Sequence, residues 1–209
     1  MNEPAAAAGR APTGAGPAAL KTIALDLDDT LNDFTETLRQ GRFPYDEAYA
    51  LPEETFHRYL EGIRNDAPEA GDLLSTEYSF FRYKIHAQCY RRARARADGV
   101  EFVRWLRRNG WRIVLCTQRD LRRANGATRV WLQENDIPFD HLFMARNKIV
   151  FCSAWGIARL VDDDVFSITH GERYGVTVYY PIMEKHRSLP ARAARGFQTF
   201  EEVKRWIQE

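Results

Sequence analysis

Hydrophobic positions along the chain form short runs that alternate with longer stretches of helical periodicity. Short apolar runs bounded by polar residues predict buried strands, and five such runs occupy 20–27, 111–117, 142–145, 158–162 and 176–180. Apolar residues spaced three or four apart predict helices at 99–109, 120–135 and 148–155, and another from Thr199 onward. Strands that alternate with helices in this way predict a parallel sheet with right-handed crossovers.

Polar residues and glycine mark the ends of several of these helices. Gly110 follows the first helix and predicts its end, because glycine readily adopts the left-handed backbone found there. Thr199 and Glu202 have the spacing of a capping box, which predicts the start of the last helix. Asp164 is predicted to cap a helix that begins near Val165.

One connection breaks the alternation. Residues 32–97 contain no strand-like run, yet a structureless loop of that length is improbable in a compact protein. The segment has a helical pattern and is rich in aromatic residues, and we interpret it as a helical subdomain inserted after the first strand. Most of its aromatic side chains are expected to form its own core, with one or two facing a substrate. They are Phe43, Tyr45, Tyr49, Phe56, Tyr59, Tyr78, Phe80, Phe81, Tyr83 and Tyr90.

Composition narrows the functional classes. A chain of 209 residues fits one domain with an insertion, and its net charge of +1 gives no overall attraction to nucleic acid or to a membrane. Three cysteines without metal-type spacing argue against a disulfide framework and favour a cytoplasmic location. No apolar run reaches the length of a membrane span. Residues 1–19, mostly Ala, Gly and Pro, predict a disordered tail.

Candidate chemistry begins where the first apolar run ends in Asp26 and Asp28. Residues two apart on a strand share a face, so both carboxylates can start on the same side. Acids at the end of a buried strand are costly unless a cation meets them, which points to a divalent metal and a phosphate-bearing substrate. An alternative is an acidic helix start, with Asp29 or Thr30 as the N-cap. That alternative leaves Asp26 unexplained, because Asp26 lies inside the apolar run.

Further polar residues end other predicted strands. Thr117 ends the second strand, Asp162 and Asp163 end the fourth, and Lys148 begins a helix. Ligands of open parallel sheets bind beyond the carboxyl ends of the strands, so these groups are expected to converge at one edge. Carboxylates suit Mg²⁺, and a hydroxyl with a lysine suits phosphate oxygens.

This set allows a phosphoryl-transfer mechanism. Asp26 can attack phosphorus and form an aspartyl-phosphate. Asp28 can protonate the leaving oxygen and then activate water, and its backbone carbonyl can reach the metal. Thr117 and Lys148 can hold phosphate oxygens, while Asp26, Asp28 and Asp162 supply oxygen ligands for Mg²⁺.

At this point the residues resemble a known family. The run Asp26-Leu27-Asp28-Asp29-Thr30 matches the D-x-D-x-T signature of the haloacid dehalogenase (HAD) superfamily, and Thr117, Lys148 and the Asp162–Asp163 pair follow in that family's order. The resemblance covers about residues 20–183. It implies a Rossmann-like parallel sheet, formed by 20–31 and 98–209, with a small helical cap inserted at 32–97.

The resemblance also implies residue roles. These are Asp26 as nucleophile, Asp28 as general acid and base, Thr117 as phosphate binder, Lys148 as charge stabiliser, and Asp162 and Asp163 as the metal-binding pair. Lys148 follows Asn147, where relatives often carry an acid, and its alternative role is a solvated lysine at a helix start.

Within the superfamily the chain looks most like the nucleotidase branch. The features that carry this likeness are Thr117-Gln118-Arg119, Thr128, Trp131-Leu132, Ile137-Pro138-Phe139-Asp140 and Leu160-Val161-Asp162-Asp163. Arg119 lies just beyond Thr117 and is predicted to touch substrate. The many arginines between 91 and 123 have two interpretations, either solvated helix faces or a basic rim that attracts phosphorylated substrates.

The sequence therefore predicts a Mg²⁺-dependent phosphomonoester hydrolase that acts on a small phosphorylated metabolite, with a nucleoside monophosphate as the leading substrate. The first alternative is a polynucleotide end-processing phosphatase. Nucleic acid is the less favoured partner, because a cap that closes over the site would exclude a long polymer. The second alternative is a HAD-fold binding protein without turnover. Neither the specific substrate nor the oligomeric state follows from the sequence.

Overall fold

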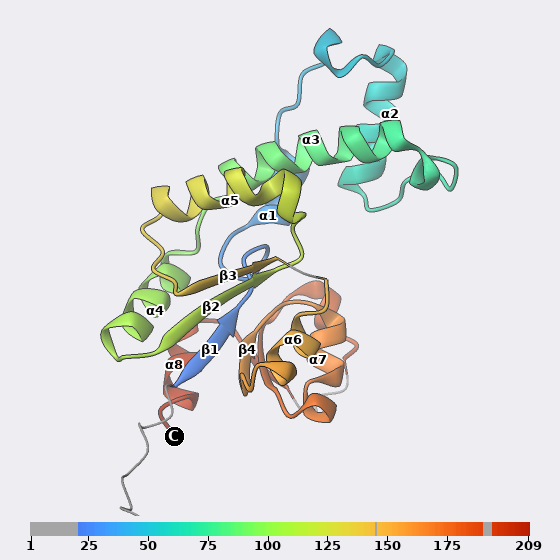
Figure 1. The fold of residues 1–209 in the computed structure, drawn as a ribbon. Helices are drawn as coiled ribbons and strands as arrows, with labels where there is room; N and C mark the ends of the chain where they lie inside the picture. The colour runs from blue at the N-terminus through green and yellow to red at the C-terminus, as the bar shows by residue number, and fades with distance from the viewer. Residues whose placement is uncertain (1–20, 145, 190–193) are drawn as a thin grey trace, which may run out of the picture.

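Six parallel strands form the central sheet in the computed structural model of the protein (Figure 1). Their spatial order is β3-β2-β1-β4-β5-β6, so β1 lies between β2 and β4. The strands are β1 Thr22–Leu25, β2 Arg112–Thr117, β3 His141–Met144, β4 Arg159–Val161, β5 Thr177–Pro181 and β6 Ala194–Phe197. This arrangement confirms the predicted α/β class with a Rossmann-like parallel sheet.

The structure describes residues 21–144, 146–189 and 194–209. The tail predicted at 1–19 lies outside these residues. Leu20, which was expected to begin the first strand, and Ala145, which was expected to end the third, also lie outside them. Within the described ranges, no helix combines the length and the apolar character needed to cross a membrane.

Helices cover both faces of the sheet, and the alternation of side chains along the strands explains why. In β1, Ile23 and Leu25 pack in one hydrophobic cluster with α4, α5 and α8, whereas Ala24 packs in a second cluster with α6 and α7. Both faces of the strand are therefore buried, which is why its sequence is an unbroken apolar run. The helices are α4 Ala97–Arg108, α5 Leu121–Glu134, α6 Lys148–Ala154, α7 Val165–His170 and α8 Phe200–Trp206.

Most predicted helix ends are confirmed. The Asp164 side chain accepts a hydrogen bond from the Phe166 N–H at 3.1 Å and caps α7. The Glu202 carboxylate accepts one from the Thr199 N–H at 3.0 Å at the start of α8. Gly110 follows α4 with a φ of +73°. The sequence patterns missed β6, which pairs with β5 mainly through backbone groups and buries only Phe197 fully.

Residues between β1 and α4 form a helical insertion that carries its own hydrophobic cluster. Its helices are α1 Phe34–Gln40, α2 Glu53–Arg64 and α3 Thr76–Arg92. Aromatic side chains dominate the cluster, with Phe56 and Phe81 almost completely buried. Part of α3 lies along α5, where the Tyr83 hydroxyl donates to the Arg123 carbonyl, while α2 projects away from the sheet (Figure 1). That the insertion acts as a cap stays a prediction.

Trp131 ties α5 to the segment that follows α3. Its indole N–H donates to the Ala93 carbonyl at 2.6 Å, and the side chain is 1% exposed. We expect Trp131→Phe to lower the free energy of unfolding by about 1–3 kcal/mol, because it removes this buried hydrogen bond and leaves the carbonyl unpaired. Urea titration followed by circular dichroism measures the change. Trp155→Phe is the matched control, since Trp155 is 71% exposed, and equal losses in both variants would contradict the assignment.

Candidate active site

The order of the strands brings the predicted site residues to one edge of the sheet. Asp26 follows β1, Thr117 ends the neighbouring β2, and Asp162 follows β4 on the other side. The Asp26 N–H donates to the Val161 carbonyl at 2.9 Å, so the ladder between β1 and β4 continues to the first acid. The strand itself ends at Leu25, and the chain then turns at Asp29, which has a φ of +56°.

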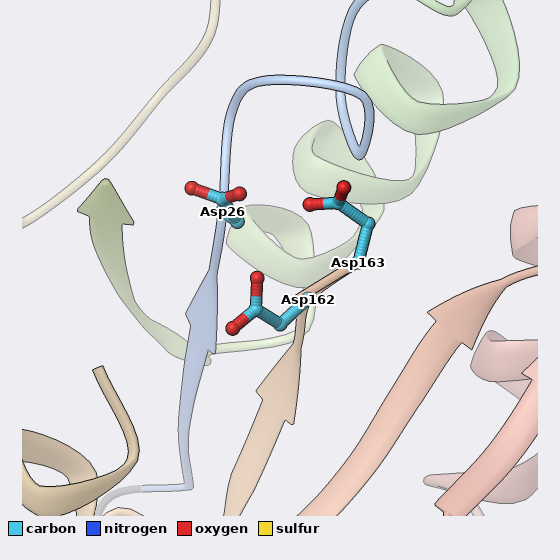
Figure 2. Close-up of side chains that lie close together, drawn as sticks. All are labelled: Asp26, Asp162 and Asp163. Atoms are coloured by element: carbon cyan, nitrogen blue, oxygen red, sulfur yellow. The ribbon is translucent and has the colours of Figure 1, made fainter. Parts of the chain in front are cut away.

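Three carboxylates face one another across the ends of β1 and β4 (Figure 2). One oxygen from each of Asp26, Asp162 and Asp163 lies within 4.8 Å of the others, and all three residues are buried. Burial, together with repulsion from Asp162 and Asp163, raises the pKa of Asp26 well above its usual range, although Lys148 opposes this shift. Such a cluster needs positive charge to stay ionised.

Lys148 supplies part of that charge from the first residue of α6. Its ammonium lies 2.9 Å from Asp26 Oδ2 and 2.5 Å from Asp162 Oδ1. Burial alone would lower its pKa, but the two carboxylates outweigh burial and raise it, so the ammonium stays charged. With only 3% of its surface exposed, Lys148 is not the solvated lysine of the alternative interpretation.

The remaining carboxylate oxygens fit a metal ion. Asp26 Oδ1 and Asp162 Oδ2 are buried without any hydrogen-bond partner among the described residues. Asp163 already has two partners, since its oxygens accept from the Thr30 hydroxyl at 3.4 Å and from the Lys185 ammonium. Buried oxygens without partners are costly, and an all-oxygen donor set of this kind suits Mg²⁺.

Asp28 belongs to a second charged group. Both of its carboxylate oxygens accept from Arg119, with the Nε–Oδ2 distance at 2.9 Å. The Arg119 side chain is fully buried, and its Nη1 also donates to the Thr128 hydroxyl at 3.0 Å. The Arg119 guanidinium therefore binds Asp28, and the substrate contact predicted for Arg119, which also lines the cavity described below, stays a prediction. The metal contact predicted for the Asp28 carbonyl stays a prediction.

Thr117 is buried at the end of β2, and its hydroxyl accepts weakly from the Arg119 N–H at 3.4 Å. Next to it, the Gln118 side chain donates to Asp164 at 3.0 Å. These contacts hold the loop after β2 against the start of α7, so the Thr117 hydroxyl lies at the same edge as Asp26.

A cavity of about 420 Å³, open to solvent, lies over these residues. Most of its wall comes from the core, and the helical insertion contributes four residues. Tyr90 is one of the insertion aromatics of which one or two were expected to face a substrate, but the sequence analysis did not single out Phe34, Arg82, His86 or Lys185, which also line the cavity. Arg82, His86 and Tyr90 are spaced four apart on α3 and share one helix face, which is a signal that the sequence did contain. Nothing in the sequence pattern pointed to Lys185.

The insertion side of the cavity is a cluster of aromatic rings, Phe34, His86 and Tyr90, which we call the ring wall. Phe34 stacks on Tyr90 with centroids 5.2 Å apart and meets the edge of His86 at 5.3 Å. Burial, reinforced by Arg82, lowers the pKa of His86 to about 4, so its imidazole is neutral at pH 7. The ring wall is therefore uncharged, while Arg82 beside it is exposed.

Solved structures with a similar fold include several HAD-family hydrolases. The magnesium-bound HAD-hydrolase YfnB of Bacillus subtilis is 10% identical and has a TM-score of 0.58, covering 91% of this chain and 99% of that one. A haloacid dehalogenase-like hydrolase of Streptococcus pneumoniae is 13% identical with a TM-score of 0.60, covering 90% and 98%. CbbY of Rhodobacter sphaeroides, in complex with phosphate, is 15% identical with a TM-score of 0.58, covering 88% and 96%.

The chain has the fold of the HAD-like hydrolases. No protein-family model and no curated protein sequence matches it. At identities of 10–15% the likeness concerns the fold, and the chemistry of this chain has to be argued from its own residues.

Replacing Lys148 tests its role as the buried counter-charge. Lys148→Met leaves Asp26 and Asp162 without a cation, and we expect a loss of about 3–5 kcal/mol in unfolding free energy at pH 7 with chelator present. Both carboxyl groups have a folded-state pKa above the unfolded value. Their contribution to stability is therefore present at low pH and lost as pH rises, so the variant should lose less at pH 5.

Urea titrations of the Lys148 variant at the two pH values measure this difference. The control is Lys204→Met, which removes a surface lysine paired with Glu201 at 3.0 Å, and its effect should stay within about 1 kcal/mol at both pH values. A loss in Lys148→Met that does not depend on pH would argue against charge burial as its cause.

Proposed function

We propose that the protein is a Mg²⁺-dependent phosphomonoester hydrolase that works through an aspartyl-phosphate on Asp26. The observation that carries this proposal is the environment of Asp26. One of its oxygens binds Lys148, and the other has no partner among the described residues and lies beside Asp162 and Asp163 at the base of an open cavity. With Lys148 on one oxygen and a Mg²⁺ ion on the other, the carboxylate would stay ionised and could attack phosphorus.

The residues present account for both chemical steps. In the first, an Asp26 oxygen bonds to phosphorus while the bond to the leaving oxygen breaks, and that oxygen takes a proton from Asp28. In the second, Asp28 takes a proton from water, whose oxygen attacks phosphorus and releases Asp26. Thr117 and Lys148 hold the phosphoryl oxygens as charge moves. A Mg²⁺ ion held by Asp26, Asp162 and Asp163 would offset repulsion between Asp26 and the anionic substrate.

The ring wall supports a nucleoside monophosphate as substrate. Flat uncharged rings suit the face or edge of a nucleobase, and the cavity volume of about 420 Å³ is within the usual range for a small ligand. Arg82 forms no ion pair with any described carboxylate, so its guanidinium is available for a polar group of the substrate.

One observation favours a second function, a polynucleotide end-processing phosphatase. The exposed arginines of α3 and α5 form no ion pair within the described part of the chain, and they are Arg82, Arg91, Arg92, Arg122, Arg123 and Arg129. On α4, by contrast, Arg104 and Arg107 pair with acids. Unpaired arginines on two helices that pack together suit the phosphate backbone of a nucleic-acid strand.

Removing the proposed nucleophile tests the main proposal. We expect the wild-type protein to release phosphate from a nucleoside monophosphate only with Mg²⁺, and Asp26→Asn to lose about 1,000-fold or more in kcat because the amide is not a nucleophile. A phosphate-release assay with and without chelator measures both. Asp136→Asn is the control, since Asp136 is exposed and far from the strand ends, and it should keep full activity. Turnover by Asp26→Asn equal to wild type would refute the mechanism.

A second assay separates the two substrate classes. We expect a mononucleotide to be hydrolysed with the higher kcat/KM, because the ring wall accepts one base. The double variant Arg122→Glu and Arg123→Glu should then change kcat/KM by less than about 3-fold, since arginines beyond the cavity do not touch a small substrate.

The control for charge is Arg108→Glu on α4, which is also exposed. A preference for an oligonucleotide with a terminal phosphate, lost at higher salt and in the Arg122 and Arg123 variant but not in the Arg108 variant, would instead establish the polynucleotide function.

A further inference from the structure

The orientation of Asp28 is set by its neighbours. Its two carboxylate oxygens receive Nε and Nη2 of Arg119, and Oδ1 also accepts from the Asn32 amide at 3.3 Å. The Asp28 side chain is 22% exposed, so one edge of the carboxylate can still reach a group in the cavity. A two-point contact with a planar guanidinium restricts both the position and the rotation of a carboxylate.

Arg119 is in turn held from two further directions. Its Nη1 donates to the Thr128 hydroxyl, which donates onward to the Ala124 carbonyl at 2.8 Å within α5. The guanidinium lies 4.1 Å from the centroid of Tyr90, a residue of the ring wall. With its side chain fully buried, Arg119 links the loop after β2, helix α5 and the insertion to a single carboxylate.

This arrangement leaves Arg119 poorly placed to bind the phosphoryl group. A guanidinium has five N–H donors, and three of them point at Asp28 and Thr128. The two that remain lie one on each Nη atom, and the side chain that carries them is fully buried. Lys148 contacts Asp26, and it is the residue that the proposed function assigns to the phosphoryl oxygens.

We propose that Arg119 is a positioning residue. It holds the Asp28 carboxyl group where its proton meets the leaving oxygen. Because Arg119 also contacts Tyr90, it couples the position of the ring wall to that of Asp28. The inference rests on the proposed phosphatase function. In the affected step the P–O bond breaks, its electron pair stays on the leaving oxygen, and that oxygen takes the proton from Asp28.

The proposal predicts a dependence on the leaving group. An alkoxide must be protonated as it leaves, whereas p-nitrophenolate is stable without a proton. A misplaced Asp28 should therefore slow release of an alcohol far more than release of p-nitrophenol. A residue that only stabilises the fold, or that binds the phosphoryl group, would affect both substrates alike.

The experiment measures kcat and KM of Arg119→Met and Arg119→Lys, with saturating Mg²⁺, for glycerol phosphate and for p-nitrophenyl phosphate. We expect Arg119→Met to lower kcat for glycerol phosphate on the order of 100-fold and for p-nitrophenyl phosphate by less than about 5-fold, with KM nearly constant. Arg119→Lys keeps the charge but not the planar fork, so it should lose most of the same activity.

Two variants keep the test valid if Arg119→Met does not fold. Thr128→Val removes one anchor of Arg119 and should give a smaller loss with the same substrate dependence. Tyr90→Leu removes the ring beneath the guanidinium and should do likewise.

Equal losses on both substrates, a raised KM at unchanged kcat, or full activity of Arg119→Lys on glycerol phosphate would each overturn the inference. These results are distinct from a failure of the proposed function. If the wild-type protein releases phosphate neither from these two substrates nor from a nucleoside monophosphate, or if Asp26→Asn retains activity, the phosphatase proposal itself fails and the role of Arg119 falls with it.

Discussion

The site depends on one electrostatic constraint, the burial of three carboxylates at the end of two neighbouring strands. Asp26, Asp162 and Asp163 are too close to remain ionised together without a cation, because their mutual repulsion is strong where water is excluded. Lys148 meets two of them, and Lys185 meets the third. Two oxygens still lack partners among the described residues, and this is the observation on which the proposed Mg²⁺ site rests.

The backbone around the acids is built to hold this arrangement. The sheet ladder continues to the Asp26 N–H, so the first acid is fixed by the strand pair and not by a free loop. Asp29 adopts a left-handed backbone, which aspartate tolerates better than most residues, and its carboxylate accepts from the Thr35 N–H at 2.8 Å. The tight turn then sends the chain into the helical insertion, which brings the ring wall back over the acids.

Two charged groups share the cavity and serve different purposes. The first, around Lys148, offsets part of the negative charge on the carboxylates buried in the sheet core. The second, Asp28 with Arg119, lies nearer to solvent and joins the core to the insertion through the Tyr90 ring. Separating the two carboxylates in this way gives them unlike surroundings, which is how a single site can contain both a nucleophile and a proton donor.

The sequence by itself determined five of the six strands, the acids at their ends and the helix caps, because each depends on residues that are close together along the chain. An unbroken apolar run such as 23–25 specifies a strand buried on both faces, and polar residues at the ends of such runs must meet at one edge of a parallel sheet. Asp164 and Glu202 could be assigned for the same reason, since a cap contacts residues only two or three positions away.

Only the tertiary structure decided which partner each charge meets. Arg119 and Asp28 are separated by 91 positions, and no local pattern shows that the guanidinium binds the Asp28 carboxylate. The same holds for the pairing of Lys185 with Asp163. It also holds for the ring wall, because the spacing of residues on α3 identifies a shared helix face but does not show that this face borders the cavity. Periodicity identifies the face of a helix, but the packing of distant elements determines what that face touches.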